Sequence, residues 1–365
     1  MTTSTHPPAP ALRLVAPAAP HPAAFFEAAH RAFQSATAHS RSRQEHFVIG
    51  GQSLRFHFAG DAWLPQFTAA LAHRAAPPTA RPHLTICVWD SASTGARMPA
   101  PPWSSADYSP RGEIAPYCHE RYRAGYQLDA GLLSLLDVRR GLALLWTADA
   151  ARLPRYELTF PARSILYWWA QVQALQMVHA GAVGHAGGGV LLVGKGGSGK
   201  STTALACLQA GLDYAGDDYV LVDDQPTPRA HSLYCSGKLH AGHIGRLPVF
   251  LPLIHNHSHL TSEKALLYLN DAYAPQLVAD LPLSAIVLPR VTGAARTSYR
   301  RVSTVQSLAA LAPSTMRQLP GAGPADYAHF SRLARCLPAY TLDLGQDLAE
   351  IPAVVLRLIA EAGRR

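Results

Sequence analysis

The chain has 365 residues, of which 48% are hydrophobic, and carries a formal net charge of +8. This length suggests about two domains, and no apolar run approaches the roughly 20 residues of a membrane-spanning helix. The positive charges are mostly single arginines without interleaved aromatics, so we expect neither a nucleic acid nor a membrane as partner. The five scattered cysteines show no CxxC spacing, which favours a reducing, cytoplasmic location over a disulfide framework.

Residues 1–40 are expected to form a disordered tail, because the stretch from Met1 to about Ala24 is rich in Pro, Ala, Ser and Thr. Residues 41–160 are expected to form an α+β N-terminal domain without a nucleotide motif. Its predicted elements are a hairpin of His46–Ile49 and Leu54–Phe58, a helix at Trp63–His73, and strands at Leu84–Trp89, Gly131–Leu136 and Ala143–Trp146. We assign this domain the presentation of a substrate, for example by pairing an extended peptide with a free sheet edge.

Residues 161–365 are expected to form an α/β catalytic domain. Apolar residues at helical spacing predict a helix over Phe160–Met177 that joins the two halves. Further predicted strands are Val178–Val183, Val190–Val193, Tyr214–Gly216, Tyr219–Val222, His231–Cys235 and Ala285–Pro289, and further helices are Lys200–Ala210, Asp326–Cys336 and Leu348–Ala362.

The strongest signal is a phosphate-binding loop. Its eight residues are Gly194, Lys195, Gly196, Gly197, Ser198, Gly199, Lys200 and Ser201, which match G-x-x-x-x-G-K-[ST] at every fixed position. A predicted strand precedes the loop and a predicted helix follows it, so backbone N–H groups and the helix N-terminus would face a triphosphate. We expect Lys200 to reach the β- and γ-phosphates of ATP, Ser201 to bind Mg²⁺, and the adjacent Thr202 to belong to the nucleotide site.

Two pairs of carboxylates follow the loop. Asp217-Asp218 stands at a predicted strand end, where one carboxylate can hold a metal while the other orients the attacking hydroxyl. Asp223-Asp224 resembles the more common metal-side pattern, but Gln225-Pro226-Thr227-Pro228 after it reads as a hairpin turn. The strand-end position favours Asp217-Asp218.

Several basic and histidine residues are candidates of lower rank. The chain has four lysines, all within one stretch: Lys195, Lys200, Lys238 and Lys264. Lys238, Lys264 and Arg290 are candidates for phosphate contact or for stabilising the transition state, and each reads equally well as a solvated charge. His255, His257 and His259 alternate as zinc ligands on a strand would, but Pro252 and polar neighbours favour a loop.

His179 with Gly181, the apolar strand, Gly194–Ser201 and Asp217-Asp218 together resemble the catalytic core of the HPr kinase/phosphorylase family. The resemblance implies a P-loop kinase core of the type shared with phosphoenolpyruvate carboxykinase, a serine acceptor, and a possible homo-oligomer. By position it makes Asp217 the base, Asp218 a magnesium ligand, and His179 an active-site partner of Asp217.

The whole chain is more similar to the HPr-kinase-like proteins found beside ribosomally made peptides, including lasso peptides. Thr202 replaces the usual Glu, and the N-terminal half differs from that of bacterial HPr kinases. The features that carry this second likeness are the Gly50-Gly51 hairpin, the Trp168-Trp169 helix and the segment Ser236–Leu239. In that group the acceptor is a peptide hydroxyl.

These observations favour an ATP- and Mg²⁺-dependent kinase that acts on a Ser or Thr hydroxyl of a peptide or small protein. A nucleotide-gated, ATP-hydrolysing peptide-binding module would share the loop and the metal site but would need no acceptor base. A small-molecule kinase would use the long loop from Ala241 to Thr261 as a lid.

Overall fold

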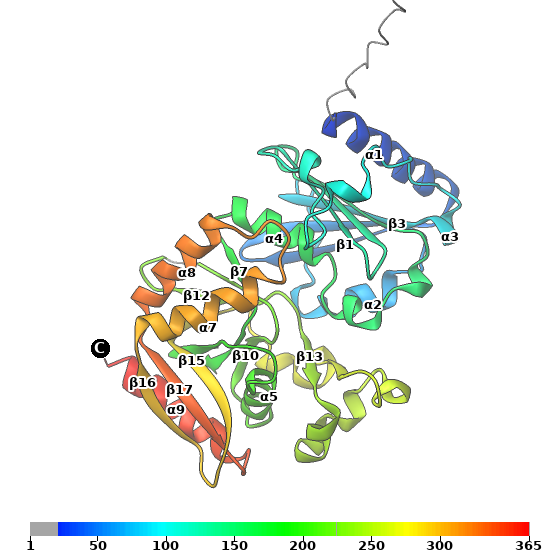
Figure 1. Ribbon diagram of the computed structural model, residues 1–365. Helices are drawn as coiled ribbons and strands as arrows, with labels where there is room; N and C mark the ends of the chain where they lie inside the picture. Colours follow the sequence, from blue (N-terminus) through cyan, green and yellow to red (C-terminus); the bar gives the residue numbers. More distant parts are fainter. Residues whose placement is uncertain (1–20, 224, 365) are drawn as a thin grey trace, which may run out of the picture.

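A computed structural model describes residues 21–223 and 225–364, which form a mixed α/β structure with three sheets. Figure 1 shows a blue-to-green N-terminal half packed on a green-to-red C-terminal half. Within the described residues, no helix combines the length and the hydrophobicity needed to cross a bilayer.

The N-terminal half is built on a six-stranded sheet in the order β1-β2-β3-β6-β5-β4. β2, β3 and β6 are parallel to one another, whereas the β1–β2 and β4–β5 pairs are antiparallel. The elements of this half are α1 (Pro22–His39), β1 (Ser42–Ile49), β2 (Gln52–Ala59), α2 (Leu64–Ala69), β3 (Leu84–Asp90), α3 (Ser91–Thr94), β4 (Tyr122–Gln127), β5 (Leu132–Asp137) and β6 (Leu142–Thr147).

The prediction of a disordered tail over residues 1–40 is wrong for Pro22–His39, which forms helix α1. Phe25, Phe26 and Phe33 of this helix are buried against one face of the six-stranded sheet. The prediction used the composition of the segment and did not consider the spacing of these phenylalanines, which places them on one face of a helix. The part of the predicted tail over residues 1–20 lies outside the described residues.

The C-terminal half is built on a nine-stranded sheet whose main path is β10-β8-β9-β15-β12-β11-β7, with β17 beside β15 and β16 beside β17. Its elements are α4 (Arg163–Val172), β7 (Gln176–Val178), β8 (Gly181–His185), β9 (Gly188–Leu192), α5 (Lys200–Gln209), β10 (Asp213–Gly216), β11 (Val220–Val222), β12 (Arg229–His231), β13 (Ser236–Leu239), β14 (Ala265–Tyr268), α6 (Asn270–Tyr273), β15 (Asp280–Ala294), β16 (Ser298–Val302), α7 (Thr304–Met316), α8 (Pro324–Cys336), β17 (Ala339–Gly345) and α9 (Glu350–Ala362). β13 and β14 form a separate two-stranded sheet.

The nine-stranded sheet lies between two pairs of helices. Residues of α5 and α9 share one hydrophobic cluster with the sheet, and residues of α7 and α8 share another with its opposite face. β15 lies near the middle of the sheet, where it is parallel to both β9 and β17. The connection from β9 to α5 lies at the carboxyl end of β9, beside the parallel strand β15.

The expected strand Val178–Val183 is broken in the structure. Val178 ends β7, Gly181 begins β8, and the two strands occupy distant positions in the sheet. His179 lies in the break, where its backbone N–H donates to Thr315 Oγ1 at 3.0 Å instead of to a strand neighbour. The break turns the His179 side chain toward the site described below.

The two halves share one core cluster. It contains Phe56 and Ile86 from the N-terminal sheet together with Trp168 of α4 and Leu221 of β11. Trp168 also donates a hydrogen bond from Nε1 to the carbonyl of Pro320 at 3.0 Å. The expected helix joining the halves is therefore present as the shorter α4, and it lies between them (Figure 1).

Candidate active site

The phosphate loop connects β9 to α5, as the motif requires. Gly194, Gly197 and Gly199 have φ values of 136°, 78° and 106°, a region that residues with a Cβ rarely adopt. A Cβ on Gly199 would lie 2.4 Å from Leu344 Cδ1, so the close approach of β17 to the loop also depends on this glycine.

Lys200 points back into the loop. Its Nζ donates to the carbonyl of Gly194 at 2.8 Å and to that of Lys195 at 3.3 Å. Burial lowers the pKa of this lysine, and the nearby Asp217 and Asp218 oppose the shift. The ammonium is thus held by carbonyl oxygens at the position where a phosphate oxygen can replace them.

Asp217 and Asp218 occupy the turn between β10 and β11, as the strand-end argument expected. Asp218 has a φ of 72°, which is uncommon for a residue with a side chain. The two carboxylates therefore have different surroundings: Asp217 is 1% exposed, whereas Asp218 lines a hollow together with His179 and Lys238.

Asp217 is a buried carboxylate without hydrogen bonds, because neither of its oxygens has a partner of standard geometry. Burial and the neighbouring charge of Asp218 raise its pKa to about 7, while Ser201 and Lys200 act in the opposite direction. A buried, unpaired carboxylate is costly unless a cation or a proton compensates it. Asp217 and the Ser201 hydroxyl are therefore a suitable oxygen donor set for Mg²⁺, which prefers such ligands.

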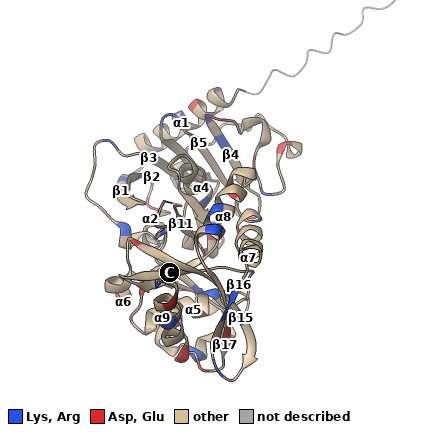
Figure 2. Ribbon diagram, turned by 90° about the vertical axis from the view of Figure 1, so that its left-hand side faces the viewer, with Lys and Arg blue, Asp and Glu red and all other residues tan. Residues whose placement is uncertain are grey.

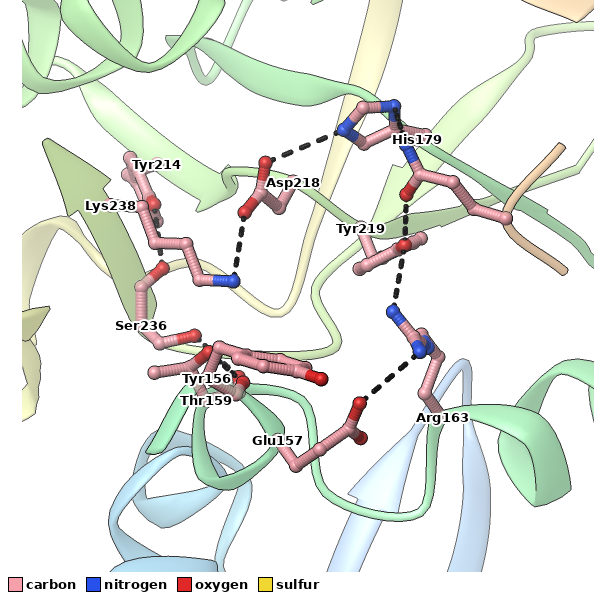
Figure 3. Close-up of polar contacts among 11 residues, drawn as sticks. Tyr156, Glu157, Thr159, Arg163, His179, Tyr214, Asp218, Tyr219, Ser236 and Lys238 are labelled. Carbon is pink, nitrogen blue, oxygen red and sulfur yellow. Dashed lines mark hydrogen bonds and ion pairs between the residues drawn. The ribbon is translucent and has the colours of Figure 1, made fainter. Parts of the chain in front are cut away.

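Asp218 lies between two partners. His179 Nε2 is 3.5 Å from its Oδ1, and Lys238 Nζ is 3.7 Å from its Oδ2 (Figure 3). Burial alone would raise the pKa of Asp218, but the contact with His179 and the charge of Lys238 outweigh it and hold the pKa below its ordinary value. The expected pairing of His179 with Asp217 is wrong, because the left-handed turn presents Asp218 to the imidazole instead.

A chain of polar contacts fixes the protonation of His179 (Figure 3). Arg163 Nη1 donates to Tyr219 Oη at 3.2 Å, Tyr219 donates to the side-chain oxygen of Gln318, and Gln318 Nε2 lies 3.1 Å from His179 Nδ1. An arginine can only donate and an ionised carboxylate can only accept, so the direction of the chain from Arg163 to Asp218 is set at both ends.

The direction of the chain makes Nδ1 of His179 an acceptor and places the single ring proton on Nε2, facing Asp218. Burial, as the largest cause, lowers the pKa of His179 and favours this neutral form. His179 thus acts as a donor that orients Asp218, while Asp218 remains the proton acceptor of the pair.

The three basic candidates are placed differently. Lys238 has its Nζ 3.7 Å from the centre of the Phe160 ring, and burial lowers its pKa to about 8. Lys264 is exposed and lines the same hollow as Lys238. Arg290 lies on β15, where its Nε is 3.6 Å from Asp343, and it does not line that hollow.

Other candidate residues lie outside this group. Asp223 accepts hydrogen bonds from His231 Nε2 at 2.8 Å and from the backbone of Arg229 at 3.0 Å, so it supports the β11–β12 pairing. Asp224 lies outside the described residues. Asp223 is therefore committed to contacts within the sheet.

The long segment from Ala241 to Thr261 forms three short 3-10 helices, two of which are buried in part against the core. Leu247, Phe250 and Ile254 are almost fully buried, so the middle of this segment packs against the core. Within the described part of the chain, no three His, Cys, Asp or Glu side chains gather as a metal-binding group.

The sequence patterns did not point to several residues that line the central hollow, among them Arg163, Tyr219, Gln318 and Tyr156. Of these residues, Tyr219 has the clearest signal in the sequence, because it directly follows the Asp pair. Gln318 lies in the connection between α7 and α8, far from every motif, and nothing in the local sequence points to it.

Three hollows adjoin along the site. The central one, of about 360 Å³, is lined by the phosphate loop, His179, Asp218 and Lys238. A second, of about 310 Å³, shares Gly199, Thr202 and His243 with it. A third, of about 370 Å³, shares Tyr156, Arg163 and Gln318 with it on the other side.

Comparison with known proteins gives a likeness of structure at low sequence identity. No protein-family model matches the chain, and no curated protein matches it. Among solved structures, the Hpr(Ser) kinase/phosphatase from Coxiella burnetii matches at 12% identity with a TM-score of 0.29, covering 51% of this chain and 95% of that one. The likeness is confined to half of this chain and carries no weight for its activity.

Proposed function

We propose that this protein is an ATP- and Mg²⁺-dependent kinase that transfers the γ-phosphate of ATP to a Ser or Thr hydroxyl. The observation that carries the proposal is the shared hollow, in which Lys200 and Ser201 of the phosphate loop and the oriented, ionised Asp218 line one space. A phosphate site beside a positioned acceptor for a hydroxyl proton is the arrangement that phosphoryl transfer needs.

Ser201 and Asp217 would hold the magnesium ion, since Asp217 is buried without hydrogen bonds beside the loop. When bound, Mg²⁺ supplies neutralisation of the charge on the phosphate oxygens. This assignment exchanges the roles that the sequence resemblance implied for Asp217 and Asp218.

The remaining groups act on the phosphates and the acceptor. Lys200 would exchange its hydrogen bonds to the loop carbonyls for contacts with the β- and γ-phosphates. Lys238, beside Asp218, would offset charge that develops on the γ-phosphoryl group. The acceptor oxygen forms a bond to the γ-phosphorus, the bond from that phosphorus to the β-bridging oxygen breaks, and the hydroxyl proton passes to Asp218. Because the pKa of Asp218 is depressed, its main contribution is alignment of the hydroxyl, which suits a loose transition state.

The second hollow suits the base of the nucleotide. It extends from Gly199 and Thr202 at the start of α5 to the apolar side chains of Val291, Leu344 and Leu348. With the base there and the phosphates on the loop, the γ-phosphate would face Asp218.

The acceptor class is proposed from the sequence resemblance, which points to a ribosomally made peptide of the lasso type. The test is intact mass spectrometry of candidate peptides encoded beside the gene, after incubation with ATP, Mg²⁺ and the protein. We expect a gain of one phosphate with the unaltered chain, and its loss with Lys200→Ala or Asp218→Asn.

The two variants separate the competing functions. Asp218→Asn should reduce transfer by about 100-fold or more, the typical contribution of a positioned acid–base group, while nucleotide affinity stays near that of the unaltered chain. The nucleotide-gated binding module predicts a different result. Asp218→Asn would then consume ATP as fast as the unaltered chain, and both proteins would bind the peptide without phosphorylating it.

A further inference from the structure

The third hollow adjoins the reacting end of the candidate site. It lies where the turn between β4 and β5, the segment Tyr156–Glu157 and the connection between α7 and α8 meet. Tyr156, Arg163 and Gln318 form its border with the central hollow that contains Asp218. The two hollows are on the order of 360 and 370 Å³, so the space beyond Asp218 equals that around the phosphate loop.

The placement of the nucleotide leaves this hollow free. The opposite hollow, next to Gly199 and Thr202, suits the base, and the phosphate loop suits the triphosphate. The γ-phosphate would then point toward Asp218 and the border formed by Tyr156, Arg163 and Gln318. A group that enters through the third hollow therefore approaches the γ-phosphate from the side opposite the base.

The rim of the third hollow carries two exposed apolar side chains. Leu128, in the β4–β5 turn, is 66% exposed, and Tyr156 is 42% exposed. Both side chains line the same hollow, so each is available for apolar contact with a molecule bound there. Neither residue belongs to the phosphate loop or to the contacts of Asp218.

The arginines of the hollow are mostly committed to the fold. Arg111 donates to the carbonyl oxygens of Met316 and Ala322, and Arg163 binds Tyr219 and lies 3.5 Å from Glu157. On the rim, the exposed Arg317 and Asp129 carry opposite charges. Recognition here therefore depends on apolar contact and shape more than on net charge.

Pairing of a peptide with the adjacent edge strand is blocked. Tyr126 of β4 donates its backbone N–H to Gly112 at 2.7 Å, and Ile114 donates to Ala124 of β4 at 3.0 Å. The outer edge of β4 is thus occupied by residues 112–114 of the same chain. The free-edge mode expected from the sequence does not hold at β4, and side-chain contacts must carry the recognition instead.

We propose that the third hollow is the acceptor groove. It binds an extended peptide whose Ser or Thr hydroxyl crosses the border residues to reach Asp218, while an apolar side chain of the same peptide packs against Leu128 and Tyr156. The fate of the hydroxyl rests on the proposed kinase function, whereas the binding of the peptide does not.

The test uses the full chain and a library of 12-residue peptides with a central serine and randomised flanks. Binding is measured by fluorescence anisotropy with Mg²⁺ and a non-hydrolysable ATP analogue. The variant is Leu128→Asp, and the matched control is Val305→Asp on α7, which is 76% exposed and lies outside the three hollows. Equal affinity of all three proteins for a fluorescent ATP analogue establishes that the fold is intact.

We expect the unaltered chain and Val305→Asp to select peptides with an apolar residue at a constant distance from the serine. Leu128→Asp should bind them about tenfold or more weakly, the loss expected when one leucine contact is removed. Unchanged peptide binding by Leu128→Asp, or no peptide binding by the unaltered chain, would show that the third hollow is not the acceptor groove.

Phosphate incorporation is recorded separately with ATP. Selective peptide binding that depends on Leu128, without incorporation, would support the groove and count against the kinase function. Incorporation with the same KM and the same sequence preference in Leu128→Asp would support the kinase function and count against the groove.

Discussion

At the scale of single residues, Asp217 and Asp218 are neighbours in the chain with opposite electrostatic surroundings. Asp217 is buried without hydrogen bonds and has a pKa of about 7, while His179 and Lys238 hold the pKa of Asp218 below its ordinary value. Asp218, whose backbone is left-handed, lines the central hollow, whereas Asp217 is buried.

The raised pKa of Asp217 predicts a dependence of stability on pH. The folded chain binds this proton more tightly than the unfolded chain, whose Asp titrates near its ordinary value of about 3.9, so stability should fall as the pH rises from about 4 to 7. Asp217→Asn removes the buried charge and should stabilise the metal-free protein at pH 8 by at most about 4 kcal/mol, with little change at pH 4.

Urea unfolding of both proteins at the two pH values, with EDTA present, measures this difference. The same variant should lose Mg²⁺-dependent transfer, so stability and activity would change in opposite directions. If Asp217→Asn were less stable than the unaltered chain at pH 8, the charge of the Asp217 carboxylate would have to be compensated in the folded protein.

At the scale of elements, the loop between β9 and α5 depends on how closely β17 approaches it. Gly199 combines a φ of 106°, which residues with a Cβ rarely adopt, with a close neighbour, because a Cβ would lie 2.4 Å from Leu344 Cδ1. Gly199→Ala must therefore move the loop, the start of α5, or Leu344.

We expect Gly199→Ala to weaken nucleotide binding by about 100-fold, because the N–H groups and Lys200 would no longer converge on the phosphates. Gly242→Ala is the matched control, since a Cβ there meets no atom within 4 Å. Isothermal titration calorimetry with ATP and Mg²⁺ measures the affinities, and equal affinity of the two variants would contradict this role of the close approach.

At the scale of the whole molecule, charged residues are scattered over both halves (Figure 2), and the halves are joined by a common core. Trp168 and Trp169 of α4 belong to the cluster that also contains residues of β2, β3 and β11. Cutting the chain at residue 160, the expected domain boundary, would expose one side of this cluster to water.

The shared core predicts a single cooperative unfolding transition. Tryptophan fluorescence reports in part on Trp63 and Trp89 of the N-terminal half, and bound fluorescent nucleotide reports on the phosphate loop. Bound nucleotide stabilises the folded chain, so the urea midpoints from the two probes are extrapolated to zero nucleotide, where they should coincide. Residues 161–365 alone should not fold. Separate midpoints, or a folded C-terminal fragment, would show that each half is independently stable.

Local features of the fold follow from short stretches of the sequence. The structure has the expected strand and helix on either side of Gly194–Ser201, the hairpin around Gly50-Gly51, and the Asp pair between β10 and β11. These features depend on short-range rules: glycines that permit positive φ, alternation of apolar residues, and strand ends that turn. The buried face of α1 obeys the same rules, but a low-complexity composition concealed it.

Which of these residues contact one another depends on how distant elements pack. His179 faces Asp218 instead of Asp217 because one backbone angle turns the pair, and Gln318 reaches His179 because α7 packs on the nine-stranded sheet. The groove beyond Asp218 is lined by residues from three distant parts of the chain. Such contacts arise from the packing of segments that are far apart in the chain, and local sequence patterns do not specify them.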